Sequence, residues 1–237
     1  MQSSRTRKLA ILALLAALAY VIMVYGRVPV LTVPPFLRYD PKDVIFAIGG
    51  FLFGPLSVLA MSIVVSFLEM ITVSETGIIG FFMNVLSTCA FACTAALIYK
   101  KLHTLKGAII GLAAGWVTAA AVMVLWNYIV TPIYLASLGT GFSDWDELSK
   151  SVAQIRPVVA GMLIPIFLPF NLLKGGLNAA ITMLLYKPVR TALSKSGLLP
   201  RPSGDAPKSR INVGAMVVSA FLLATGILVI LVYQGII

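Results

Sequence analysis

Three polar residues lie inside long apolar stretches of the chain: Asn127, Asn171 and Lys174. An unpaired lysine near the centre of a membrane helix costs at least about 2.5 kcal/mol, so such a residue normally faces a cavity or a partner. Asn171 and Lys174 are three residues apart, which places them on one helix face. Their amide and ammonium groups offer hydrogen-bond donors and an acceptor. We therefore predict a small-molecule site that holds the three residues at one depth, with a structural Lys174–Glu69 ion pair as the alternative.

The residues needed for metal binding or catalysis are scarce. The chain has one histidine, His103, and two cysteines, Cys89 and Cys93. The cysteines share a helix face, but no further cysteine or nearby histidine completes a metal site, so we interpret them as packing residues. No G-x-x-x-x-G-K-[ST] phosphate-binding loop occurs. We predict that the protein is not an enzyme and that it uses no cofactor and no metal.

The composition determines which kind of element can position these residues. Of 237 residues, 59% are hydrophobic and 11% are charged, whereas about a quarter are charged in a soluble domain. This excludes a water-soluble enzyme, and the long, non-alternating apolar runs exclude an outer-membrane β-barrel. We predict an all-α integral membrane protein in a lipid bilayer.

The predicted membrane helices follow the uncharged runs. The first run follows basic residues but has no small-residue cleavage site after it, so we interpret it as an uncleaved helix rather than a signal peptide. The other expected spans have apolar runs long enough to cross a bilayer. The expected ranges are helix 1 at 9–25, helix 4 at 77–99, helix 5 at about 108–134, helix 6 at about 158–186, and a seventh, C-terminal helix at 211–233.

The run at 44–68 contains Gly54-Pro55 and has two interpretations, one long helix or two shorter ones. Lys and Arg concentrate on the cytoplasmic side of short membrane loops. Two crossings put most of the basic residues on the side of the N-terminus, whereas one crossing puts many of them outside. We therefore expect a split, with a half-length helix 2 that is covered by protein because lipid cannot satisfy its backbone ends.

The charge distribution also indicates the partners and the domain organisation. The net charge of +10 gathers on the cytoplasmic side, which favours anionic lipid or a cytoplasmic partner and not nucleic acid. We expect a membrane domain at 1–190, a basic, proline-containing cytoplasmic linker at 191–210, and the additional helix at 211–237. The first loop, 26–43, carries several prolines together with Tyr39 and Asp40. It suits a lid over the site or an ordinary ordered surface loop.

Four stretches occur in an order and spacing that resemble a known family. They are residues 39–56 (YDPKDVIFAIGGFLFGPL), 97–101 running into 106–108, 127–134, and 169–175 (PFNLLKG). Together they resemble the S components of energy-coupling factor (ECF) transporters, and most closely the riboflavin-specific, RibU type. The resemblance covers about residues 9–190. The seventh helix departs from that family's pattern.

The resemblance implies a six-helix bundle with a short second helix and a vitamin held near the outer face under the first loop. It implies that Asn127, Asn171 and Lys174 contact the flavin, with Asp40 and Tyr39 as loop candidates. A further implication is a shared module of one transmembrane T component and two cytoplasmic ATPase subunits.

The T component is the implied partner of helix 1. Ala13 and Ala17 match the alanine motif that docks there, and their small-x-x-x-small spacing lets another helix approach closely.

The expected function is therefore riboflavin capture and import across the plasma membrane of a prokaryote, with the N-terminus in the cytoplasm. Riboflavin is a neutral, flat ring system with a hydroxylated tail, which suits amides and apolar walls. FMN, a different vitamin, or a stand-alone secondary transporter are the alternatives.

Overall fold

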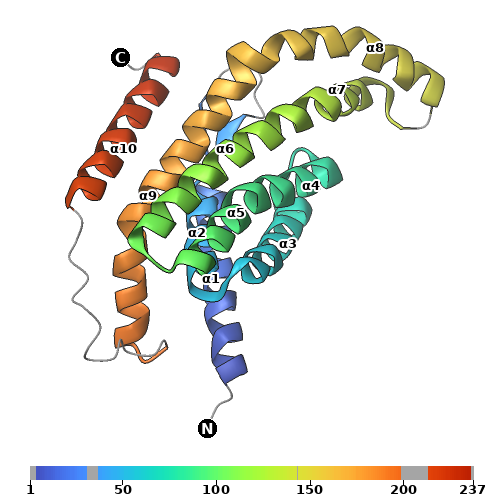
Figure 1. The fold of residues 1–237 in the computed structure, drawn as a ribbon. Helices are drawn as coiled ribbons and strands as arrows, with labels where there is room; N and C mark the ends of the chain where they lie inside the picture. The colour runs from blue at the N-terminus through green and yellow to red at the C-terminus, as the bar shows by residue number, and fades with distance from the viewer. Residues whose placement is uncertain (1–3, 31–36, 143, 199–212, 236–237) are drawn as a thin grey trace.

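The computed structural model describes residues 4–30, 37–142, 144–198 and 213–235. The described chain is almost entirely helical and forms an elongated bundle with its N- and C-terminal ends at opposite ends of the molecule (Figure 1). The helices are α1 (Ser4–Tyr25), α2 (Lys42–Phe53), α3 (Pro55–Thr72), α4 (Gly77–Thr88), α5 (Thr94–Leu102), α6 (Leu105–Ile129), α7 (Thr131–Thr140), α8 (Trp145–Met162), α9 (Leu168–Lys195) and α10 (Val213–Tyr233).

The predicted membrane class is confirmed by the length and composition of these helices. Five helical stretches among the described residues are long and apolar enough to cross a bilayer, and α10 adds a shorter apolar stretch, Met216–Val232. The five stretches are Arg5–Tyr25, Pro55–Thr72, Gly77–Leu102, Leu105–Thr140 and Trp145–Lys195.

The half-length second helix is present as predicted. The twelve residues of α2 span about 18 Å, too little for a bilayer of about 30 Å. Gly54 takes a φ of 90°, a conformation open to glycine, and Pro55 starts α3. Every residue from 42 to 51 is buried, so protein covers the helix. A Cβ on Gly50 would lie 2.6 Å from Val58 Cγ2, which shows how closely α2 and α3 pack.

Two π-helical turns interrupt the longer spans. The turn η1 (Cys89–Cys93) joins α4 to α5, and η2 (Leu163–Phe167) joins α8 to α9. Pro165 lies within η2. A proline lacks the N–H of a regular α-helical turn, and a π-turn is a common accommodation. The η2 turn lies directly before the part of α9 that carries Asn171 and Lys174.

Three predicted boundaries were wrong. Helix 5 was expected to end near residue 134, but α7 continues the helical structure to Thr140 and packs against α8. Helix 6 was expected at about 158–186, but the helical structure begins with α8 at Trp145 and continues through η2 and α9 to Lys195, with Pro188 inside α9. Leu193 packs into the bundle core, which stabilises the helix beyond the proline. Residues 191–195 are therefore helical, and 199–210 of the expected linker lie outside the described residues.

The first loop forms a short antiparallel ribbon of β1 (Val28–Pro29) and β2 (Arg38–Tyr39). Val28 pairs with Tyr39, and Pro29 pairs with Arg38. Residues 31–36, which complete the predicted lid, lie outside the described part of the chain. The ribbon connects the end of α1 to the buried start of α2.

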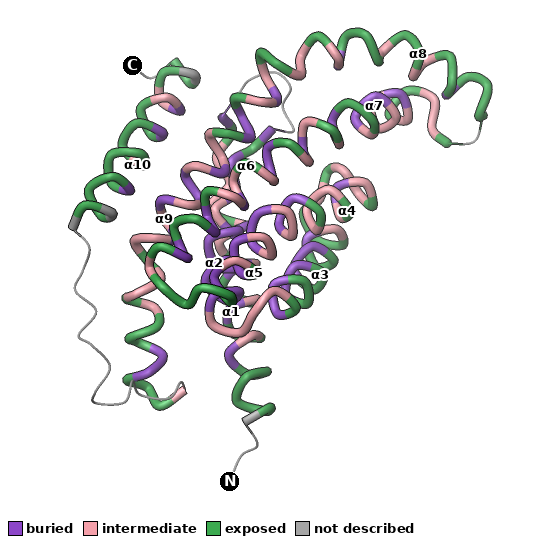
Figure 2. The backbone as a smooth tube through the Cα atoms, viewed as in Figure 1, coloured by how far each residue is buried: buried purple, intermediate pink, exposed green. Residues whose placement is uncertain are grey.

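Burial divides the bundle into a covered centre and exposed periphery (Figure 2). The centre is formed by α2 and the faces of α1, α3, α5, α6 and α9 that surround it. In contrast, α8 and α10 are exposed along most of their length.

Candidate ligand site

A cavity opens beside the first loop, at the end of the bundle where α1 finishes and α4 begins. It holds roughly 830 Å³ of empty space, open solvent at its mouth included. Four helices, α3, α4, α6 and α9, together with the first loop and the α3–α4 connection, supply its walls. The lining residues are Arg27, Leu37, Arg38, Asp40, Glu69, Ser74, Glu75, Thr76, Met83, Asn84, Ser87, Met123, Asn127, Phe170, Asn171 and Lys174.

Four of the five predicted ligand residues line this cavity: Asn127, Asn171, Lys174 and Asp40. They come from α6, α9 and the first loop, so the fold brings together residues far apart in the sequence. Their contact with a ligand stays a prediction. Tyr39 is different, because it is not among the lining residues. Its hydroxyl donates to Asn178 Oδ1 at 3.0 Å.

The two asparagine side chains are held in fixed orientations by hydrogen bonds to residues four positions away in the sequence. Asn127 Nδ2 donates to the Met123 carbonyl oxygen at 2.7 Å, and Asn127 Oδ1 accepts from Thr131 Oγ1 at 2.8 Å. Asn171 Nδ2 donates to the Phe167 carbonyl oxygen at 2.7 Å. Since an amide nitrogen carries two hydrogens, each side chain keeps a second donor for a ligand.

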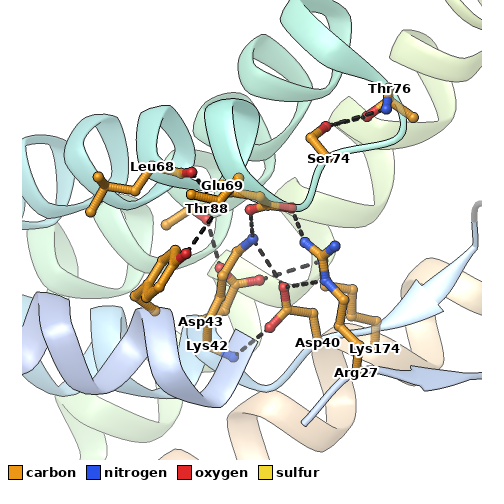
Figure 3. Close-up of polar contacts among 12 residues, drawn as sticks. Arg27, Asp40, Lys42, Asp43, Leu68, Glu69, Ser74, Thr76, Thr88 and Lys174 are labelled. Atoms are coloured by element: carbon orange, nitrogen blue, oxygen red, sulfur yellow. Dashed lines mark hydrogen bonds and ion pairs between the residues drawn. The ribbon is translucent and has the colours of Figure 1, made fainter. Parts of the chain in front are cut away.

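A cluster of alternating charges, which the sequence did not predict, adjoins the cavity through three residues that line it, Arg27, Asp40 and Glu69 (Figure 3). Lys42 Nζ lies 2.6 Å from Glu69 Oε2 and 2.9 Å from Asp40 Oδ2. The Arg27 guanidinium pairs with Glu69 and lies 3.7 Å from Asp40 Oδ2. We call these four residues, Arg27, Asp40, Lys42 and Glu69, the ionic floor. It ties the end of α1, the first loop, α2 and α3 together.

Lys42 falls within the predicted first loop, 26–43, but the structure places it in the first turn of α2. Its side chain is 2% exposed, because it points into the bundle from the first turn of α2. Asp43, the next residue, is buried as well. The signal available in the sequence was the alternation Asp40, Lys42, Asp43 directly before a half-length apolar helix.

Lys174 has a separate partner. Its Nζ lies 3.6 Å from Asp43 Oδ2, and Asp43 Oδ1 accepts from Thr88 Oγ1 at 2.6 Å. The alternative of a Lys174–Glu69 pair is therefore wrong, because Glu69 belongs to the ionic floor. Lys174 stays 16% exposed, which leaves its ammonium accessible from the cavity.

Asp40 is stabilised as a carboxylate. Burial by itself raises the pKa of this carboxyl, but the ammonium groups of Lys42 and Lys174 and the Lys42 N–H hold the pKa below its usual value. A depressed folded-state pKa stabilises the fold above the unfolded-state pKa of about 4. This stabilisation is lost as the pH falls through the folded-state value. Asp40 is therefore charged at neutral pH.

Burial, and then the carboxylates of Asp43 and Asp40, raise the pKa of the Tyr39 hydroxyl well above its usual range. Tyr39 is therefore a neutral donor at neutral pH, as its hydrogen bond to Asn178 requires.

With this geometry described, comparison with known proteins identifies the family. Residues 7–186 match the family described as ECF transporter, substrate-specific component. The chain belongs to this family. The predicted resemblance is confirmed, and so is the prediction of a non-enzymatic transport component.

Relatives of this S component include curated riboflavin transporters. "Riboflavin transporter FmnP" of Bacillus subtilis is 29% identical over 77% of this chain and 91% of its own length. "Riboflavin transporter RibU" of Staphylococcus aureus is 26% identical over 81% of this chain and 94% of its own length.

A solved structure is similar as well. The chain described under "Structure and mechanism of the S component of a bacterial ECF transporter" matches with a TM-score of 0.60 and 26% identity, over 80% of this S component and 98% of that chain. The family match ends at residue 186, so α10 lies beyond it.

Proposed function

We propose that this S component captures riboflavin at the outer face of a prokaryotic plasma membrane. A T component and two ATPase subunits then drive its delivery inward. The observation that carries the proposal is an open, mixed polar and apolar cavity lined by Asn127, Asn171 and Lys174, in a chain whose relatives are riboflavin transporters.

The walls suit a flat, uncharged ring system. Apolar and aromatic surface for its faces comes from Leu37, Met83, Met123 and Phe170. The amides and the Lys174 ammonium supply hydrogen bonds for its polar edge and its hydroxyl groups. The lining side chains therefore match both the apolar faces and the polar edge of such a ligand.

We expect the purified protein to retain flavin, and Asn171→Ala or Lys174→Ala to weaken riboflavin binding. Each loss removes a hydrogen bond of about 1–3 kcal/mol from a partly desolvated site, equivalent to about 5- to 150-fold in the dissociation constant. Titration of riboflavin fluorescence against detergent-solubilised protein measures it. Lys150→Ala, at an exposed position of α8, is the control. Unchanged affinity in both site variants would remove these residues from the proposed site.

FMN is the second candidate ligand, and the charges around the cavity favour riboflavin. Each of the three lining cations faces a carboxylate: Arg27 pairs with the ionic floor, Lys174 with Asp43, and Arg38 Nη2 with Glu75 Oε1 at 3.1 Å. A phosphate monoester brings about −1.5 to −2 charges at neutral pH. To bind it, the site would have to break one of these pairs.

The Arg38–Glu75 pair provides a test of this preference, because Glu75 is at the mouth and 68% exposed. We expect Glu75→Gln to tighten FMN binding by about 2- to 5-fold at low salt, in line with a screened surface pair. Riboflavin binding should stay unchanged. The FMN-to-riboflavin affinity ratio measures the effect, and Glu147→Gln on exposed α8 is the control. An equal change for both ligands would contradict the charge-balance argument.

The orientation of the chain follows the distribution of basic residues. Lys and Arg gather near the N-terminus, in the α5–α6 connection and after residue 186. The positive-inside tendency then puts the N-terminus in the cytoplasm and the cavity mouth outside.

A further inference from the structure

The C-terminal helix α10 packs along α9 through one narrow face (Figure 1). This face carries residues at the four- and three-residue spacing of a single helix face: Ser219, Leu223, Gly226 and Ile230. These four residues are buried or partly buried, while their neighbours are mostly exposed. A Cβ on Gly226 would lie 2.4 Å from Leu177 Cδ2. Such close approach through a small residue is typical of packed membrane helices.

The outer part of this face reaches residues of the cavity wall. Ile230, which is 9% exposed, belongs to an apolar cluster that contains Val30 and Leu37 of the first loop and Phe170 of α9. Leu37 and Phe170 also line the cavity. The cluster thus lies between α10 and the ligand site. The remaining buried members of the cluster are Tyr39, Val159, Phe167 and Leu177.

A hydrogen bond joins the end of α10 to the same loop. Gln234 Nε2 donates to the Pro29 carbonyl oxygen at 2.6 Å. Pro29 lies opposite Arg38 in the ribbon, and Arg38 with Asp40 lines the cavity. Gln234 therefore contacts β1, whereas the cavity residue Arg38 belongs to the paired strand β2 and Asp40 directly follows it.

We propose that Ile230 and Gln234 of α10 are positioning residues that hold the β1–β2 ribbon against α9 and so fix Leu37, Arg38 and Asp40 at the ligand site. This inference rests on the proposed riboflavin-binding function. A pre-organised wall reduces the ordering cost of binding. Because interface changes act mainly on dissociation rates, α10 slows the escape of the bound vitamin.

The test compares full-length Ile230→Ala and Gln234→Ala with Leu228→Ala. Leu228 is 53% exposed on the same helix, so its loss removes a similar volume without touching the cluster. We expect riboflavin to dissociate about 10-fold faster from Ile230→Ala and about 3-fold faster from Gln234→Ala. Leu228→Ala should match the unmodified protein, and Ile230→Leu should restore slow dissociation. Stopped-flow recovery of riboflavin fluorescence measures these rates.

Hydrogen exchange of the ligand-free protein gives a second measurement that does not depend on riboflavin. We expect faster exchange at the amides of 28, 30 and 37–40 in the Ile230 and Gln234 variants, and unchanged exchange in the α4 and α6 helices. If exchange and dissociation both match Leu228→Ala, the positioning role is wrong. If the unmodified protein binds no riboflavin, the proposed function fails, and the exchange data alone then support or overturn the positioning role.

Discussion

Lys42→Met is expected to destabilise the protein strongly, although Lys42 does not line the ligand cavity. The substitution keeps the length and apolar stem of the side chain but removes the ammonium that lies between Asp40 and Glu69. Within the ionic floor, Arg27 is then the one cation left to pair with two buried carboxylates. Removing one member of a buried ionic network typically costs about 3–5 kcal/mol. The thermal midpoint of the detergent-solubilised protein, followed by size-exclusion of heated samples, measures the loss.

The double variant Lys42→Met with Glu69→Gln separates a missing charge from missing packing. It leaves Arg27 and Asp40 as a neutral pair, so we expect it to recover much of the lost stability. Lys150→Met, at an exposed site, controls for the loss of one positive charge. If Lys42→Met is as stable as Lys150→Met, or if the double variant is no better than the single one, the ionic floor does not stabilise the fold.

The sequence could predict the features that follow from the order of charged, polar and apolar residues along the chain. The break at Gly54 followed from the distribution of Lys and Arg across the membrane, and the structure contains it. Asn127, Asn171 and Lys174 stood out because polar groups are costly in apolar spans. The structure brings all three to one cavity.

The ionic floor could not be predicted in the same way. Arg27 and Lys42 belong to a loop and a helix start in the sequence, positions where charged residues normally reach water. Only the depth of α2 inside the bundle buries Lys42, and this depth depends on close packing such as that between Gly50 and Val58. Tyr39 shows the same limitation. Strand alternation turns it away from the cavity that Arg38 and Asp40 line, toward Asn178.

The two faces of α1 differ in burial, which bears on where a partner helix could bind. Ile11, Leu15 and Ala19 are buried against the bundle, whereas Ala13 and Ala17 are exposed. Small residues on an exposed membrane helix permit close contact with another helix. The alanine face is therefore open to a further helix, which we propose to be one of the T component, while the opposite face of α1 packs against α2 and α3.

Ala17→Trp is accordingly expected to abolish riboflavin uptake while leaving riboflavin binding within about 2-fold. The indole would keep a partner helix away from α1, since close approach depends on small side chains, but it would project away from the cavity. Uptake by proteoliposomes that contain the S component, the T component and both ATPases measures transport, and fluorescence titration measures binding. Val117→Trp, at a 63% exposed position of α6, is the control and should transport normally. Normal uptake by Ala17→Trp would exclude docking through this face. Uptake by the S component alone, driven by an ion gradient, would instead indicate a stand-alone transporter.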